Sequence, residues 1–160
     1  LLSLPPLLMA IAIVSTLGPT VMNLLIAITI SQIPGFTRIV RSSVLSVVGE
    51  DYIEAAKMGG SSDLRIIMHD VLPNAIGPII VQGTMAIAQM ILLAAGLSFI
   101  GLGVQPPTPE WGTMLNQARD YMQEYPYLVT IPGIAIAISA FSFNLVGDGL
   151  RDALDPKLKN

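Results

Sequence analysis

Apolar residues occupy long segments of this chain, and short polar segments separate them. Residues 1–37 contain no Asp, Glu, Lys or Arg, and residues 71–109 contain none either. A helix of about 20 apolar residues spans the hydrocarbon core of a bilayer, so each segment is long enough to cross it. The pattern predicts an all-α, polytopic transmembrane helix bundle with about four spans.

Turn residues and charged residues set the predicted boundaries within a single transmembrane domain, residues 1–160. Gly18-Pro19-Thr20 predicts a turn between the first two spans. A hairpin buried in a soluble protein is the alternative, but an uncharged hairpin has no polar outer face. The predicted order is a hairpin of two spans (1–33), a polar segment (34–75), a third span (76–103), a connector (104–126), a fourth span (127–147) and a tail (148–160).

The polar segment predicts two short helices joined by a tight turn. Nine of the 19 charged side chains lie within residues 38–70. Gly59-Gly60 is a natural stop for the first helix, and Ser61 and Ser62 can cap the second. Pro73 is predicted to end that second helix. Its predicted apolar face, at helical spacing, consists of Leu64, Ile67, Met68 and Val71.

The connector predicts a helix at the membrane interface. Thr108-Pro109-Glu110 has the cap, first-turn proline and early acid of a helix start. Aromatic side chains favour the interface, where their rings anchor a chain at headgroup level. Docking of a substrate-delivering protein is the alternative role. The aromatic residues concerned are Trp111, Tyr121, Tyr125 and Tyr127.

The basic residues predict the topology. Four of the eight Lys and Arg residues lie in the polar segment and three lie in the tail, whereas the connector holds only Arg119. Basic residues collect on the cytoplasmic side of a membrane. The polar segment and the C-terminus are therefore predicted in the cytoplasm, with the connector outside.

Composition limits the possible chemistry. Hydrophobic residues make up 52% of the chain, and its net charge of −3 with no basic run argues against a nucleic-acid partner. The chain has no cysteine, and its one histidine, His69, excludes a two-histidine metal site. A phosphate-binding P-loop and a nucleophile elbow are missing from the sequence. The chain is therefore predicted not to be an enzyme.

The chain begins with Leu1 inside an apolar segment, which predicts a piece truncated at its N-terminus.

Several blocks resemble one family of transport proteins. Glu54-Ala55-Ala56, Gly60 and Leu72-Pro73 match the EAA signature of bacterial ABC importer membrane subunits. The blocks LLSLPPLL, GLGVQPPTPEWG and NLVGDGLRDALDPKL occur in family-like order. Across nearly all 160 residues the chain resembles the C-type permease of dipeptide and oligopeptide importers.

The resemblance implies a function and a set of partners. It implies a permease subunit in the bacterial inner membrane, paired with a homologous permease subunit, two cytoplasmic ATPase subunits and an external solute-binding protein. No cofactor is implied in this chain, because the partner subunits bind ATP. The polar segment would be the coupling element that docks on the ATPase, and the residues implied at that joint are Glu54, Ala55, Ala56, Lys57, Gly59, Gly60, Leu72 and Pro73.

Three uncharged polar residues within the spans are candidates for the translocation path. They are Gln82, Gln89 and Asn144. Hydrogen bonding between helices is the alternative role for the two glutamines. At the level of the whole chain the alternative is a secondary carrier or channel without an ATPase, although such proteins usually carry charged residues inside their spans. For the polar segment, the alternative is a pair of amphipathic helices that lie on lipid.

Overall fold

The computed structural model describes residues 4–154, and these residues form helices, turns and loops without a strand. The predicted all-α class is therefore confirmed. The elements in chain order are α1 (Pro6–Leu17), α2 (Val21–Val48), α3 (Asp51–Met58), α4 (Asp63–Arg65), the π-helix η1 (Ile66–Val71), α5 (Leu72–Phe99), α6 (Trp111–Ala118), the 3₁₀-helix η2 (Arg119–Tyr121) and α7 (Tyr127–Leu154).

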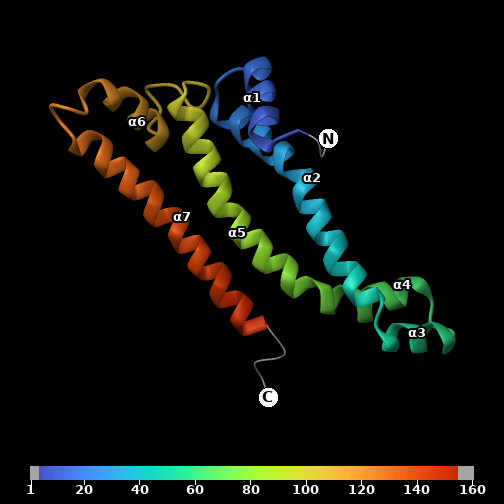
Figure 1. Ribbon diagram of the computed structural model, residues 1–160. Helices are drawn as coiled ribbons and strands as arrows, with labels where there is room; N and C mark the ends of the chain where they lie inside the picture. The colour runs from blue at the N-terminus through green and yellow to red at the C-terminus, as the bar shows by residue number, and fades with distance from the viewer. Residues whose placement is uncertain (1–3, 155–160) are drawn as a thin grey trace.

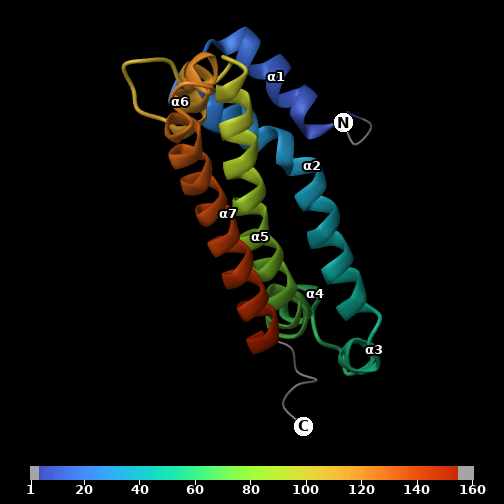
Figure 2. The ribbon, with the colours of Figure 1, turned by 60° about the vertical axis from the view of Figure 1, so that its left-hand side comes forward.

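Three helices are long and apolar enough to cross a membrane: α2, the continuous helix Asp63–Phe99, and α7. Figures 1 and 2 show them running along the bundle, with α1 and α6 at one end and α3 and α4 at the other. Only 17–22% of the most apolar window of each is buried, so most of it is left uncovered by the described residues. The predicted first span corresponds to α1, an apolar helix of 12 residues, which is shorter than a span.

The predicted hairpin ends at residue 33, with a continuation of its second helix through Pro34-Gly35 as far as Arg41 as the alternative; helix α2 follows that continuation and extends beyond it to Val48. A proline inside a helix removes one hydrogen bond, and in membrane proteins neighbouring helices make up for that loss. Here the added turns are held by packing, because Val47 is buried in an apolar cluster with residues of the polar segment. The members of this cluster, called the junction cluster below, are Val47, Ile53, Ile66, Val71 and Ala75.

A second apolar cluster holds the opposite end of the bundle together. It joins α1, α2, the end of α5 and the start of the connector. Its buried members are Ala10, Val14, Leu24, Ala27, Ile28, Leu97 and Val104. The two clusters fix α2 to α5 at both ends, while the spans between them are largely uncovered.

Pro73 does not end the second short helix as predicted. Residues Ile66–Val71 form a π-helix, and the chain passes directly into α5, with Pro73 in its first turn. An α-turn would press the proline ring against the carbonyl of the residue four positions earlier, and the wider π-turn removes this conflict. Within the same turn, the side-chain amide of Asn74 donates to the backbone carbonyl of Asp70 over 2.6 Å. The result is one helix of 37 residues from Asp63 to Phe99.

The predicted glycine stop after α3 is confirmed in detail. Gly60 has φ +76°, the left-handed conformation that closes many helices. The N–H of Gly60 donates to the Lys57 carbonyl over 3.0 Å, and the N–H of Ser61 donates to the Ala56 carbonyl over 3.1 Å. These two bonds form a Schellman motif. Ser62 takes the N-cap position of α4 as expected, but its side chain makes no capping hydrogen bond.

In the connector, helix α6 begins at Trp111, after the predicted start at Thr108. Glu110 is the cap, because its Oε2 accepts the N–H of Thr113 over 2.8 Å. Thr113 in turn donates its hydroxyl to the carbonyl of Val104 over 2.6 Å, which ties α6 to the loop after α5. The carboxylate of Glu110 at the N-cap thus takes the role expected of the Thr108 hydroxyl.

Helix α6 touches α5 through a glycine. A Cβ atom on Gly112 would lie 2.7 Å from the Cα of Ala95, so only glycine allows this approach. At the other end, α7 runs on to Leu154, beyond the predicted boundary at residue 147. The start of the predicted tail is therefore helical, and Asp155-Pro156 and the last two lysines lie outside the described residues.

We expect Gly60→Ala to destabilise the turn between α3 and α4 by about 1–2 kcal/mol, because a Cβ atom is strained at positive φ. Hydrogen exchange should report faster opening of the last turn of α3. Gly59→Ala, at φ −72°, is the matched control and should change little. Equal protection in both variants would contradict the turn geometry.

We expect Gly112→Ala to destabilise the packing of α6 on α5 by about 1–3 kcal/mol, since the added methyl group overlaps backbone. The measurement is the midpoint of thermal unfolding in detergent. The control is Gly96→Ala, one residue from the contact, where a Cβ would meet nothing within 4 Å. An unchanged midpoint for Gly112→Ala would refute this contact.

Candidate functional site

The EAA residues lie on α3, at the end of the bundle opposite α6 (Figure 1). Glu54, Ala55 and Lys57 are exposed, and Ala56 is half-buried. Gly59 and Gly60 continue this exposed surface into the turn. Small side chains beside a glycine turn leave the backbone of α3 open to close approach by another surface.

One side chain attaches α3 to the rest of the chain. Ile53 is completely buried, with 0% exposure, in the junction cluster. Val47 of α2, Ile66 and Val71 of η1, and Ala75 of α5 make up the rest of that cluster. Ala56 packs against the same cluster from its edge. The α3 helix is therefore held by apolar burial against both long helices that flank the polar segment.

Leu72 and Pro73 belong to a different element from the EAA residues. They form the first turn of α5, and both are exposed. Residues next to the two halves of the motif contact each other, because Val71 and Ala75, which flank Leu72-Pro73, lie in the same cluster as Ile53 of α3. The 37-residue helix is continuous through this point.

The predicted apolar face of the second short helix is wrong in its register. Of the four residues assigned to it, only Val71 is buried, while Leu64, Ile67 and Met68 are exposed. The hydrogen bonds of a π-helix connect residues five apart, which brings Ile66 onto the same face as Val71. Helical spacing taken from an ordinary α-helix could not find this face.

An exposed apolar surface beside α3 escaped the sequence analysis. Met58 is 85% exposed at the end of α3, and Leu64 is 71% exposed in the first turn of α4. Ile67 and Met68 add to it. Unpaired apolar side chains in a polar segment are typical of a protein interface, and the positions of Met58 and Leu64 on either side of the glycine turn were the available signal.

The three candidate path residues do not share one cavity. Gln82 is half-buried and lines a cavity of about 740 Å³ between α5 and the end of α7. Gln89 is exposed on α5, and Asn144 is half-buried on α7. Within residues 4–154 the three side chains make no hydrogen bond to another residue, so interhelical bonding does not account for them inside the described chain.

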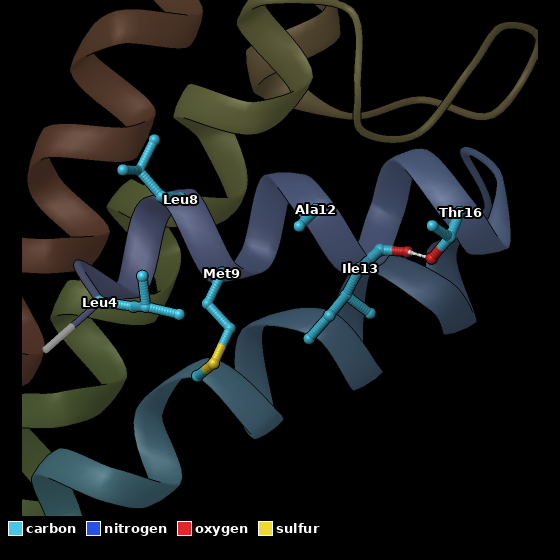
Figure 3. Close-up of a pocket in the computed structure, with 6 residues that line it drawn as sticks. All are labelled: Leu4, Leu8, Met9, Ala12, Ile13 and Thr16. Carbon is cyan, nitrogen blue, oxygen red and sulfur yellow. Dashed lines mark hydrogen bonds between the residues drawn. The ribbon is translucent and has the colours of Figure 1, made fainter. Parts of the chain in front are cut away.

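A second cavity, of about 360 Å³, lies along α1. Figure 3 shows its lining, in which only Thr16 carries a polar group, and that hydroxyl donates to the carbonyl of Ile13 over 2.8 Å. The other lining residues are Leu4, Leu8, Met9, Ala12 and Ile13. The lining is therefore apolar and offers no group for catalysis.

The charged groups do not form a catalytic or metal centre in the part of the chain that the structure describes. His69 is exposed on η1, and across residues 4–154 no three His, Asp or Glu side chains gather to hold a metal ion. The ion pair found among these residues joins Arg119 and Asp120 at 3.4 Å, and it is exposed. The geometry instead presents an exposed helix, α3, at one end of the bundle, attached to α5 through the junction cluster.

Comparison with known proteins places these features in a family. The family described as "Binding-protein-dependent transport system inner membrane component" matches residues 1–160. A di/tripeptide transport system permease protein, DppC of Pseudomonas aeruginosa, is 51% identical over 160 residues, which are 100% of this chain and 53% of that protein. DppC of Alkalihalophilus pseudofirmus, a dipeptide transport system permease protein, is also 51% identical, with the same coverage.

A third relative is named for another solute. The glutathione transport system permease protein GsiD of Escherichia coli is 48% identical over 159 residues, covering 99% of this chain and 52% of that protein. The chain thus spans about half the length of the curated relatives it matches. With a match along its whole length and three apolar helices long enough to cross a bilayer, this multi-pass membrane chain belongs to the family of binding-protein-dependent transport system inner membrane components.

Proposed function

We propose that this chain forms part of the permease of an ATP-driven importer for dipeptides, oligopeptides or a related solute. The relatives carry the names of di/tripeptide, dipeptide and glutathione transport systems, which supports a peptide-like solute. The chain itself provides no nucleotide-binding loop. Hydrolysis of ATP is therefore assigned to two partner subunits on the cytoplasmic side of the bacterial inner membrane.

The observation that carries the proposal is the attachment of α3. Its outer surface, with Glu54, Ala55 and Lys57, is free to dock on an ATPase, while Ile53 on its inner side is buried against the long helices. A displacement of α3 would be transmitted to α5 through the junction cluster. Since α5 is continuous with η1 and α4, the movement would be passed along the bundle with little loss.

The arrangement of the ends supports the proposed topology. The polar segment and the last turn of α7 lie at one end of the bundle, and α6 lies at the other (Figures 1 and 2). With the basic residues of the polar segment on the cytoplasmic side, α6 would face outward. The exposed aromatic residues around α6 would then lie at the outer interface, beneath an external solute-binding protein.

The uncovered apolar surface supports a second permease subunit as partner. The spans bury few of their own residues, and Ile76, Ile80 and Ile87 of α5 are exposed. Lipid covers part of such a surface, and a homologous subunit across the translocation path would cover another part. Gln89 and Asn144 are proposed to line that path, as uncharged polar groups suit a peptide backbone, whereas Gln82 opens into the cavity between α5 and the end of α7.

We expect Glu54→Lys to weaken association with the ATPase roughly tenfold or more, because it reverses a charge at the docking surface. Glu54 is exposed, so the change should leave the fold intact. The measurements are the amount of ATPase that co-purifies with the full-length protein and uptake of a labelled dipeptide. The control is Glu124→Lys, an equally exposed position near the opposite end.

A secondary carrier gives a different pattern in the same experiment. Uptake into vesicles would then depend on an ion gradient and would continue without ATP. Unchanged ATPase retention in Glu54→Lys would count against the docking surface, and uptake without ATP would count against the importer.

A further inference from the structure

The cavity between α5 and α7 has a chemistry that the proposed transport function does not explain. Its volume is about 740 Å³, within the range of roughly 300–1,000 Å³ usual for ligand sites. One charged side chain, Arg151 of α7, lines it together with the amides of Asn74 and Gln82. The rest of the lining is Pro73, Ile76, Gly77, Pro78, Val81, Met85 and Leu154.

Arg151 lies about midway along this cavity. Leu154 packs against Gly77, and Gly147 packs against Met85 deeper in the bundle. Arg151 is between Gly147 and Leu154 on α7, so it lies at the level of Val81 and Gln82 on α5. From Pro73 to Met85 the cavity extends over twelve residue steps, about 18 Å along the axis of α5. Asn74 lies toward the end of the bundle, and Met85 lies deeper.

The side chain of Arg151 is exposed at the cavity. Within residues 4–154 no carboxylate lies within ion-pair distance of Arg151, although Asp148 and Asp152 occur on the same helix. Both of these carboxylates are exposed and neither lines the cavity. A cation at the level of the Gln82 amide favours an oxyanion, and arginine binds phosphate oxygens with two parallel hydrogen bonds.

We propose that this cavity binds an anionic phospholipid, with its phosphate at Arg151 and Gln82 and an acyl chain along Val81 and Met85. The cavity lies at the end of two membrane-crossing helices, where headgroups are found, and basic pockets between such helices recognise anionic lipid. A peptide fits less well, because its ammonium group favours a carboxylate and the described residues of the lining include no Asp or Glu. The inference does not depend on the proposed transport function.

The test uses the full-length protein with its accompanying subunits, in phosphatidylcholine nanodiscs that contain phosphatidylglycerol. Native mass spectrometry counts the phosphatidylglycerol molecules that stay bound. Loss of a charge-assisted contact should weaken binding roughly tenfold or more in Arg151→Gln. Arg151→Lys keeps the charge and should stay within a few-fold of the wild type. Arg41→Gln, at an exposed arginine toward the same end of the bundle, is the matched control and should bind normally.

Competition identifies the ligand. Inorganic phosphate and a dipeptide are expected to displace little phosphatidylglycerol, since neither fills the apolar lining along Val81 and Met85. Equal retention in Arg151→Gln and wild type would overturn the site, and an equal loss in Arg41→Gln would reduce it to general surface charge. Displacement by inorganic phosphate would assign a free-anion site, and displacement by the dipeptide would assign a solute site; either result would overturn the lipid assignment.

Discussion

The burial of Ile53 is the interaction on which the arrangement of the polar segment depends. This side chain lies between Val47 at the end of α2 and Ile66, Val71 and Ala75 on the helix that leads into α5. A short exposed helix such as α3, with eight residues, is marginal on its own in water. Burial of one large side chain against two long helices gives it a fixed position, and the Schellman turn at Gly60 sets where the chain turns back.

The π-helix allows the chain to continue as one helix through Pro73. Pro73 lacks the donor that an α-helix needs at its position, and a simple helix would break there. A wider turn over Ile66–Val71 accepts the proline and rotates Ile66 and Val71 together into the junction cluster. The same local change therefore lengthens the helix to 37 residues and orients its apolar side. Both effects are needed if force applied at α3 is to move α5.

Lipid and protein neighbours account for the surface that remains. Most residues in the three long helices are uncovered within the chain, so their stability in isolation comes mainly from backbone hydrogen bonds and from the two apolar clusters at the ends. Glycine permits close contact where helices do meet, at Gly112 against α5 and at Gly147 against Met85. The cavity lined by Arg151 lies between α5 and the end of α7.

The sequence by itself determined the fold class, the family and the glycine turn after α3, because these depend on long uncharged segments, on motif residues and on local backbone preference. Only the tertiary structure decided where helices end. Packing carried α2 past Pro34 to Val48, the carboxylate of Glu110 displaced the expected cap at Thr108, and the π-turn carried the second short helix through Pro73. It also decided that Gln82 lines a cavity with Arg151, whereas Gln89 does not. The packing of α2 and the lining of the cavity involve side chains that are distant in sequence, and the π-turn has a different period; spacing along the chain contains neither kind of information. The Glu110 cap is local, and it competes with Thr108 through its bond to Thr113 three residues on.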